Sequence, residues 1–383
     1  MERISKFLQE RKQNNLFRVL QPANFRKAGR IYFKAKEFID LSANDYLGLS
    51  RHPHLLTAAK KALAQYGVSA SASRLLSGDL TIHHQLEEQL AVFKGKPKAL
   101  VYNSGYQANL GIISALCRRG DVIFSDRLNH ASIVDGILLS GARLFRFDHN
   151  DSGHLEFLLK RERNKFNQAL IITETIFSMD GDKCPLKEIS ALKHRYNCRL
   201  LVDEAHATGV FGRSGAGLVE QEGLNQQVDL IMGTFSKALG SFGAYIAGDK
   251  KTIEYLINTS RGFIYSTALP PAVIAANIAS LSLIKNQPFR RKTLLENARY
   301  LREELTNRGF QVKGCSQIVP LILGDVRQVI KLSRRLSRQG FWSLPIRPPT
   351  VPANEARLRF SLSYAHSKQT LNRLINVICA AGI

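Results

Sequence analysis

An aspartate and a lysine, each placed just after an apolar run, are the strongest chemical signal in this chain. Asp203 ends one such run, and Lys237 lies further along in residues 233–240, which read GTFSKALG. An acid that can pair with a pyridinium nitrogen and an amine that can form a Schiff base together predict a pyridoxal 5'-phosphate (PLP) site. The hydroxyl of Thr234 and the small residues around the lysine would let the chain approach a phosphate group.

Other polar residues follow further apolar runs and could complete such a site. Gly105 lies where a helical pattern begins, and a helix N-terminus with a glycine is an anion site that suits the cofactor phosphate. His130 could stack on the pyridine ring, His206 could donate to the phenolic oxygen, and Glu174 and Ser178 could bind substrate or cofactor. Each residue alone also fits an ordinary polar turn, so the prediction depends on their combination with the lysine and the aspartate.

The elements that must position these residues alternate between short apolar runs and helical patterns. Strands are predicted at 99–102, 121–124, 143–147, 170–173, 200–202 and 230–232. Helices are predicted at 53–66, 81–93, 108–117, 130–140, 155–165 and 186–196. This alternation predicts an α/β fold with a mainly parallel sheet covered on both faces. Functional residues of such sheets gather at the carboxyl ends of the strands, where the polar residues above lie.

After the two prolines at 270–271 the pattern changes. Helices are predicted at 272–285, 291–308, 325–339 and 369–380, with strands at 318–323 and 357–362. A long helix followed by alternating strands and helices indicates a smaller C-terminal α/β domain. We therefore divide the chain into an N-terminal helical and strand segment at 1–40, a large PLP-binding domain at 41–285 and a small domain at 286–383.

Composition and charge limit the possible functions. The 383 residues are 44% hydrophobic and 22% charged, which is typical of a soluble globular protein, and no run approaches the ~18 apolar residues of a membrane helix. The N-terminus lacks the apolar region of a secretory signal, and five scattered cysteines without a C-x-x-C pair favour reduced thiols in the cytoplasm. The net charge of +23 is dispersed. We interpret it mainly as solvated surface, with docking of an acidic acyl-carrier protein as an alternative.

Two other classes of protein compete with this interpretation. Residues 203–206 spell DEAH, a helicase box, but the closest fragment to a phosphate-binding loop, GKP at 95–97, lacks the required pattern. A basic nucleic-acid-binding protein therefore remains only as the alternative from another class. The four titratable residues at 83–88 fit no zinc spacing, and we interpret them as surface: His83, His84, Glu87 and Glu88. We expect no metal, no nucleic-acid partner and no membrane partner.

Taken together, the motifs resemble those of the α-oxoamine synthases, a family of fold-type-I PLP-dependent transferases. The resemblance depends on SANDYLGL at 42–49, FSMDGD at 177–182, DEAHATGV at 203–210 and GTFSK at 233–237. The strings HND at 149–151 and IRPPTVP at 346–352 resemble the branch that condenses L-alanine with a pimeloyl thioester of CoA or of acyl-carrier protein. Sister enzymes that use other amino acids and acyl groups, such as glycine with an acetyl thioester, share the motifs and remain alternatives.

The resemblance implies a role for each matching residue. Lys237 would bind the cofactor and later remove the Cα proton, Asp203 would pair with the pyridinium, and His130 would stack on the ring. The remaining cofactor contacts would be Gly105, Tyr106, Ser178, His206 and Thr234.

Substrate contacts and a second subunit are also implied. Arg359 would bind the α-carboxylate of the amino acid, as arginine does bidentately, with Asn44 and His130 nearby. Arg18 and Thr350 would line the acyl-substrate side. The segment Tyr265, Ser266 and Thr267 resembles the one that reaches the phosphate of the neighbouring subunit, which implies an obligate homodimer, with Ser266 and Thr267 as cofactor contacts.

Overall fold

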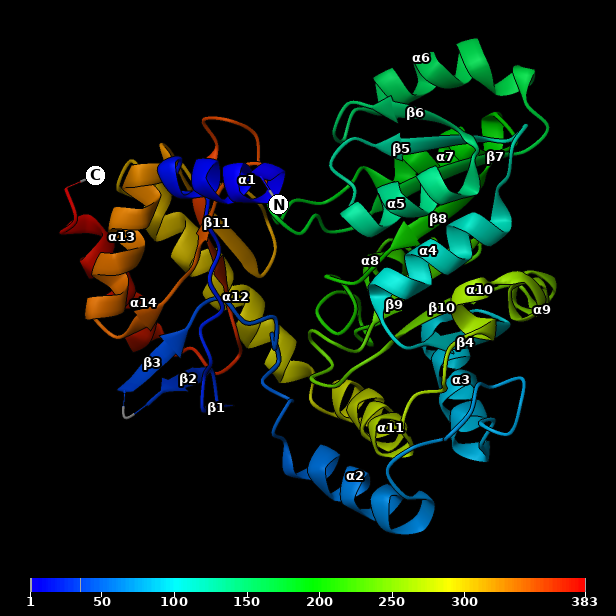
Figure 1. Cartoon of the computed structure of the whole chain (residues 1–383), viewed down its shortest axis with the longest axis horizontal. Coiled ribbons are helices and arrows are strands. Elements are labelled where there is room, and N and C mark those ends of the chain that lie inside the picture. Colours follow the sequence, from blue (N-terminus) through cyan, green and yellow to red (C-terminus); the bar gives the residue numbers. More distant parts are fainter. Residues whose placement is uncertain (1, 35, 383) are drawn as a thin grey trace. The chain divides into compact units, whose positions relative to one another are not determined.

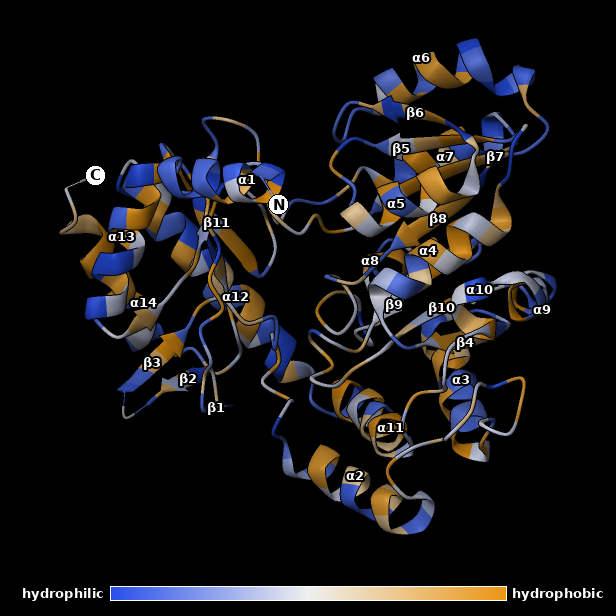
Figure 2. Cartoon of the chain, in the orientation of Figure 1, coloured by the Kyte–Doolittle hydropathy of each residue, from blue (hydrophilic) through white to orange (hydrophobic). Residues whose placement is uncertain are grey.

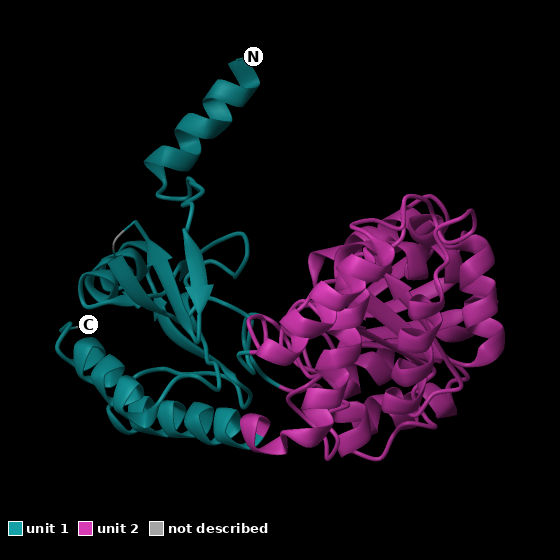
Figure 3. Cartoon of the chain, turned by 90° about the horizontal axis from the view of Figure 1, so that it is seen from below, with its two compact units in different colours: residues 1–48, 179–182, 292–383 teal, residues 49–178, 183–291 magenta. Residues whose placement is uncertain are grey.

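The computed structural model describes residues 2–34 and 36–382, which form two compact units (Figure 1 and Figure 3). Within the described residues, unit 1 combines Met1–Gly48, Met179–Asp182 and Lys292–Ile383, and unit 2 combines Leu49–Ser178 and Lys183–Arg291. The two ends of the chain therefore belong to the same unit. No helix in these ranges is long and apolar enough to cross a membrane.

Unit 2 is built on a seven-stranded sheet with the order β4-β10-β9-β8-β7-β5-β6. The strands are β4 (Lys98–Tyr102), β5 (Val122–Asp126), β6 (Arg143–Phe147), β7 (Ala169–Glu174), β8 (Arg199–Asp203), β9 (Leu230–Thr234) and β10 (Ala244–Gly248). All neighbours are parallel except β10, which is antiparallel to both β4 and β9. The predicted α/β fold with a mainly parallel sheet is confirmed. The pattern missed β10 because its sequence, AYIAG, is mostly small residues without alternation.

Helices cover both faces of this sheet, because successive strand residues point to opposite sides. Ile171 and Leu200 pack in one cluster with helical residues from 155–159 and 186–192, while Leu170, Ile172 and Leu201 pack in another with helical residues from 108–113, 133–137 and 253–256. Figure 2 shows central strands such as β8 as mostly hydrophobic, as expected for strands that are buried on both faces. The helices of this unit are α2 (Pro53–Tyr66), α3 (Thr81–Lys94), α4 (Gly105–Leu116), α5 (Ala131–Ser140), α6 (Ser152–Glu162), η1 (Arg163–Lys165), α7 (Leu186–Arg195), α8 (Leu218–Gln221), α9 (Lys250–Thr259), α10 (Arg261–Ile264) and α11 (Pro271–Asn286).

Unit 1 contains two smaller sheets. The first has the order β1-β2-β3-β12 and comprises β1 (Phe25–Lys27), β2 (Arg30–Phe33), β3 (Lys36–Asp40) and β12 (Phe341–Trp342). The second has the order β11-β14-β13 and comprises β11 (Ile318–Gly324), β14 (Ala356–Ser361) and β13 (Pro345–Ile346). The helices are α1 (Glu2–Gln13), α13 (Val326–Arg338), α14 (Lys368–Cys379) and most of α12 (Pro288–Asn307). Because β12 pairs with β3, the N-terminal strands share a sheet with the C-terminal part of the chain.

Side-chain caps explain where two helices beside the predicted site begin. The Ser104 Oγ accepts a hydrogen bond from the Gln107 amide at 3.3 Å at the start of α4. The His130 Nδ1 accepts one from the Ser132 amide at 3.2 Å at the start of α5. Both caps satisfy amides that the first turn of a helix leaves without partners. The strand ends of β4 and β5 are thereby joined directly to helix N-termini.

Candidate active site

The site residues that the sequence predicts within unit 2 lie at the carboxyl ends of neighbouring strands. Lys237 follows β9, Asp203 and His206 follow β8, and His130 follows β5. Between β8 and β5 in the sheet lies β7, which ends at Glu174. Since β5, β7, β8 and β9 are parallel, these ends meet at one edge of the sheet, which is where α/β proteins bind ligands.

The amine of Lys237 faces an imidazole. Its Nζ lies 2.7 Å from the His206 Nε2, and the lysine side chain is half-buried. The neighbouring Thr234 Oγ1 donates to the Gly243 carbonyl at 2.8 Å and accepts from the Ser236 amide at 3.1 Å. The Thr234 hydroxyl therefore stabilises the turn that carries Lys237. The Lys237 amine lies near the end of β8, where His206 is located.

Gly240 shows why this turn requires a glycine. Its φ is +64°, and a Cβ at this position would lie 2.5 Å from the Ser50 amide nitrogen, which is backbone and cannot swing away. Glycine alone adopts this conformation without strain and leaves room for the neighbouring segment. Gly240 therefore allows residues 237–240 to pack against the backbone of residues 49–50.

Asp203 is buried and held by two donors. Its Oδ1 accepts from the Ala205 amide at 2.8 Å, and its Oδ2 accepts from the Asn109 Nδ2 at 3.0 Å. Asn109 also donates to the Ser132 Oγ at 3.0 Å, and its own Oδ1 is buried with no hydrogen-bond partner in the described ranges. Sequence reasoning missed this asparagine, although its position one helical turn after Gly105 places it on the buried face of α4.

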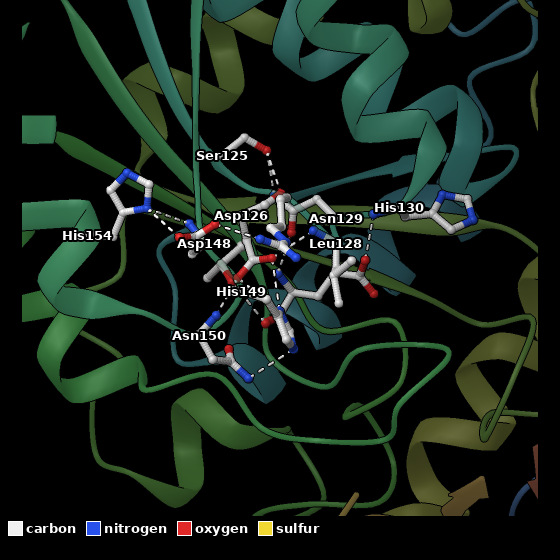
Figure 4. Close-up of polar contacts among 12 residues, drawn as sticks. Ser125, Asp126, Leu128, Asn129, His130, Asp148, His149, Asn150 and His154 are labelled. Carbon is white, nitrogen blue, oxygen red and sulfur yellow. Dashed lines mark hydrogen bonds and ion pairs between the residues drawn. The ribbon is translucent and has the colours of Figure 1, made fainter. Parts of the chain in front are cut away.

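A second network holds the backbone at His130. The His130 amide donates to the Glu174 Oε1 at 2.6 Å, and the Glu174 amide donates to the Asn129 Oδ1 at 3.1 Å. Asn129 also donates to the Ser125 Oγ and to the Ile172 carbonyl, both at 2.8 Å. Figure 4 shows His130 at the margin of this cluster, with its backbone nitrogen joined to a carboxylate. The loop after β5 is thus fixed to the end of β7, and Asn129 is a second residue that the sequence analysis missed.

Burial changes the acid–base properties of both partners in this contact. Desolvation by the surrounding protein lowers the pKa of the His130 imidazole. This effect outweighs that of the Asp203 carboxylate, which raises the same pKa. Burial and the Asp203 carboxylate raise the pKa of Glu174 to about 8, against the opposing effects of Lys237 and the His130 amide. Glu174 at the end of β7 is paired with Asp203 at the end of β8, so two carboxyl groups lie next to each other at buried strand ends. A proton on Glu174 relieves their repulsion.

The residues predicted at the cofactor phosphate surround the start of α4. A Cβ at Gly105 would lie only 3.1 Å from the Met232 Cε, and the Tyr106 hydroxyl hydrogen-bonds to Asp135. The Asn103 Nδ2 donates to the Thr267 carbonyl at 2.8 Å, and the Gln107 Nε2 donates to the Ser266 hydroxyl. The structure therefore brings the segment 266–267 and the N-terminus of α4 together within one chain.

A buried carboxylate organises the HND string. Asp126 accepts from the Leu128 amide at 2.8 Å and from the Asn150 amide at 2.9 Å, and the His149 Nδ1 lies 3.0 Å from its Oδ1 (Figure 4). The His149 ring also packs edge-on against Phe177, with centroids 4.4 Å apart, one residue before the half-buried Ser178. The HND string therefore contacts the base of the loop that carries His130.

The predicted amino-acid contacts lie in unit 1. The buried Arg359 on β14 donates to the Asn44 Oδ1 and to the Tyr46 hydroxyl, both at 3.3 Å, and also to the Ser361 hydroxyl. The charge on this guanidinium faces neutral oxygens in these contacts. Arg357, two residues earlier on the same strand, instead pairs with Asp180 at 2.6 Å. The structure thus brings Asn44 and Arg359 together.

The two residues predicted for the acyl-substrate side also meet in unit 1. The Arg18 Nη2 donates to the Thr350 Oγ1 at 3.0 Å, although the residues are 332 positions apart in the chain. Both side chains are exposed.

The interpretation of the four titratable residues at 83–88 as surface is wrong for two of them. His83 is buried, and its Nε2 lies 3.1 Å from the Leu269 carbonyl. Glu87 is buried and accepts two hydrogen bonds from Arg74, at 2.9 and 3.0 Å. Among the residues that the structure describes, no group of histidine, cysteine and acidic side chains is arranged to hold a metal. His83 lies inside because backbone groups satisfy its ring nitrogens, and Glu87 because Arg74 and the Val101 amide donate to it. Helical periodicity alone does not reveal these partners.

The donor set in unit 2 matches the chemical groups of PLP. Lys237 offers a half-buried amine for the aldehyde, and Asp203 offers a buried carboxylate for the ring nitrogen. His130 and His206 offer imidazoles for the ring and its phenolic oxygen, and the N-terminus of α4 offers amides for the phosphate. We therefore conclude that the residues present fit this cofactor.

Comparisons with known proteins agree with this geometry. Residues 36–378 match the family model described as aminotransferase class I and II. The chain is 46% identical to the 8-amino-7-oxononanoate synthase of Geotalea daltonii, over 100% of this chain and 98% of that protein. It is 47% identical to the enzyme of the same name from Geobacter sulfurreducens, over 98% and 96% of the two chains.

Solved structures of PLP enzymes have the same fold. A serine palmitoyltransferase of S. paucimobilis with bound PLP and myriocin matches with a TM-score of 0.93 and 31% identity, covering 99% of this chain and 96% of that one. The 8-amino-7-oxononanoate synthase of Francisella tularensis matches with a TM-score of 0.78 and 30% identity, covering 90% and 97%. The predicted cofactor and family are thereby confirmed. The chain belongs to the class I and II aminotransferase family and, within it, to the PLP-dependent acyltransferases of the 8-amino-7-oxononanoate synthase group.

Proposed function

We propose that the protein condenses L-alanine with a pimeloyl thioester in biotin biosynthesis. A carbon–carbon bond forms between the alanine Cα and the thioester carbonyl, the carbon–sulfur bond breaks, and the alanine carboxyl group leaves as CO₂. The products are 8-amino-7-oxononanoate, CO₂ and the free thiol, whose sulfur takes up one proton from solvent as it leaves. Similarity to 8-amino-7-oxononanoate synthases over the whole chain supports this reaction.

Three side chains of unit 2 carry the proton chemistry in this proposal. When bound, PLP supplies an electron sink for the negative charge that develops at Cα. The Asp203 carboxylate holds the proton on the ring nitrogen, which keeps that sink effective. The Lys237 Nζ takes the proton from Cα and returns it after CO₂ is lost, and it must be uncharged to act as a base. His206, 2.7 Å from this amine, can share the proton and hold the amine in place.

Binding and orientation fall to the other predicted residues. Arg359 binds the α-carboxylate with two parallel hydrogen bonds, and Asn44 at 3.3 Å keeps the guanidinium in position. His130 covers one face of the cofactor ring, where its lowered pKa favours the neutral imidazole. Ser178 contacts the cofactor, and Arg18 and Thr350 line the acyl-substrate side.

The active form is a cytoplasmic homodimer in this proposal. The resemblance supports this dimer, because Ser266 and Thr267 match the segment that reaches the phosphate of the neighbouring subunit in the family. Within this chain the two residues contact the start of α4, the predicted phosphate end. Light scattering of the purified protein tests the dimer directly. A monomer that retains full turnover would contradict it.

The observation that carries the proposal is the placement of an amine, an imidazole and a buried carboxylate at adjacent strand ends: Lys237, His206 and Asp203. The decisive experiment measures thiol release from a pimeloyl thioester with L-alanine. Acetyl thioester with glycine and palmitoyl thioester with L-serine serve as parallel reactions. Release with pimeloyl thioester and alanine alone is the expected result. Release only with another pair would retain the cofactor and the base but overturn the substrate assignment.

A further inference from the structure

Two buried residues that connect Asp203 with His130 have no role in the assignments above. Asn109 on α4 is 2% exposed, and Ser132 on α5 is 1% exposed. Gly136 lets these two helices approach closely, because a Cβ at this position would lie 2.9 Å from the Asn109 carbonyl oxygen. The Asn109 side chain thereby reaches both the Asp203 carboxylate and the start of α5.

Asp203 determines the orientation of the Asn109 amide. The Asn109 Nδ2 lies 3.0 Å from the Asp203 Oδ2 and 3.0 Å from the Ser132 Oγ. An ionised carboxylate can only accept hydrogen bonds, so the reversed amide would place two oxygens against each other. The Asn109 Oδ1 has no hydrogen-bond partner within the described residues, so no contact favours the reversed orientation. One amide hydrogen therefore points to Asp203 and the other to Ser132.

The orientation of the Ser132 hydroxyl follows from that of the amide. Its oxygen accepts from Asn109, so in the part of the chain that the structure describes the His130 Nδ1, at 2.8 Å, is the acceptor left for the hydroxyl hydrogen. The Ser132 backbone amide also donates to this nitrogen at 3.2 Å, and a backbone N–H cannot turn away. A hydrogen on Nδ1 would face both donors. The imidazole therefore accepts at Nδ1 and carries its hydrogen on Nε2.

We propose that Asn109 and Ser132 are positioning residues that fix the neutral form of His130 with its hydrogen on Nε2. The relay leads from the Asp203 carboxylate through the Asn109 amide and the Ser132 hydroxyl to the imidazole. It connects the residue that holds the proton on the ring nitrogen of the cofactor with the residue that covers the ring face. A cationic His130 at that face would disfavour the ring proton, because like charges repel each other. The inference rests on the proposed function, which assigns these roles to Asp203 and His130.

Other groups around the imidazole also act on its charge. Burial lowers the pKa of His130 most. The carboxylates of Asp203 and Asp135 raise this pKa, and Lys237 lowers it. The two donors of Ser132 stabilise the neutral ring, so they lower the pKa as well. Two more titratable side chains lie close by: Glu174 on β7, which accepts from the His130 amide, and Tyr106 on α4, whose ring centroid is 6.4 Å from that of the imidazole.

Nuclear magnetic resonance of the PLP-bound protein with 15N-labelled histidine tests the relay. The chemical shifts of the ring nitrogens distinguish a protonated from an unprotonated nitrogen, and a His130→Gln variant identifies the His130 signals. The wild-type protein should show an unprotonated Nδ1 and a protonated Nε2. Ser132→Ala should raise the pKa of His130 by about one pH unit, because one hydrogen bond to the neutral ring is lost. The matched control is Ser190→Ala on α7, which removes a buried hydroxyl that donates to the Gln227 Oε1 at 3.1 Å and should leave His130 unchanged.

A double-mutant cycle tests whether Asn109 acts through Ser132. Asn109→Ala should raise the pKa of His130 in the otherwise wild-type protein, because the hydroxyl can then turn away from Nδ1. It should have little further effect in Ser132→Ala. An equal effect in both backgrounds would show that Asn109 acts without the hydroxyl and would overturn the relay.

The variant Ser132→Ala decides the inference alone if Asn109→Ala does not fold. A hydrogen on Nδ1 in the wild-type protein, or an unchanged pKa of His130 in Ser132→Ala, would overturn the inference. Failure of the wild-type protein to release thiol from pimeloyl thioesters would instead contradict the proposed function. The resonance measurements need no substrate, so the two failures are distinguishable.

Discussion

Lys94 and Glu204 form an ion pair inside unit 2. The Lys94 Nζ lies 2.8 Å from the Glu204 Oε2, and the two side chains are only 1% and 0% exposed. Burial opposes the charge on Lys94, but the Glu204 carboxylate raises its pKa overall. The other carboxylate oxygen accepts from the Val219 amide at 2.9 Å. Glu204 directly follows Asp203, so this pair anchors the strand end that carries the predicted catalytic acid.

We predict that Lys94→Met destabilises the protein by about 3–5 kcal/mol, because it leaves a buried carboxylate without a counter-charge. Urea unfolding monitored by circular dichroism measures the change. The matched control is Lys98→Met, which breaks the exposed pair of Lys98 with Glu254 and should cost less than about 1 kcal/mol. Equal losses in the two variants would show that Lys94 contributes no more than a surface lysine.

Lys237→Ala is predicted to retain PLP binding and to lose turnover by at least about 10³-fold, since the base that moves the Cα proton is gone. Absorption spectra with and without borohydride distinguish covalent from non-covalent cofactor. The wild-type band should be trapped by the reductant, and the band of the variant should not. Lys250→Ala, at an exposed position on α9, is the control and should behave as the wild-type protein. Turnover close to wild type in Lys237→Ala would reject the assignment.

The raised pKa of Glu174 predicts how stability depends on pH. Burial and the Asp203 carboxylate raise this pKa from its ordinary value of 4.5 to about 8. The folded state therefore holds the proton more tightly than the unfolded state, and this stabilisation is complete below about pH 4.5 and is lost as pH rises through about 8. Urea unfolding of the cofactor-free protein between pH 5 and 8 should show a steeper decline for the wild type than for Glu174→Gln. Parallel profiles would contradict the shift.

Arg359→Lys is predicted to raise the KM for L-alanine at least about tenfold, because lysine cannot make two parallel hydrogen bonds to a carboxylate. Steady-state kinetics at saturating thioester measure this change. Arg357→Lys is the comparison, because Arg357 pairs with Asp180 and Glu355 and should affect stability rather than the KM for alanine. A KM for alanine that is unchanged in Arg359→Lys would remove the carboxylate-binding role from this residue.

Local patterns predicted the parts of unit 2 that depend on periodicity. The helix expected at 53–66 has the same bounds as α2, and the runs before Glu174 and Asp203 are strands β7 and β8. Apolar runs between helices leave few arrangements other than a parallel sheet, so the shared edge for the polar residues followed from the fold class.

Pairings between distant segments could not be predicted in this way. Glu204 belongs to the DEAH string, yet its partner Lys94 is 110 residues away, and no local pattern relates the two. Asn129 and Asn109 are polar residues in or beside predicted helices, and only the sheet order brings them to Glu174 and Asp203. The buried His83 was misjudged for the same reason, because its partner is the Leu269 carbonyl.

The antiparallel position of β10 has a consequence for how the lysine moves. β9 and β10 are neighbours, and the Phe235 amide donates to the Gly243 carbonyl at 2.9 Å, so the segment bearing Lys237 is a hairpin loop closed at both ends. A short closed loop has little conformational freedom to lose, and its ends cannot drift apart without breaking the sheet. In the proposed reaction, the Lys237 amine would therefore move by rotation of its own side chain, while its Cα stays in place.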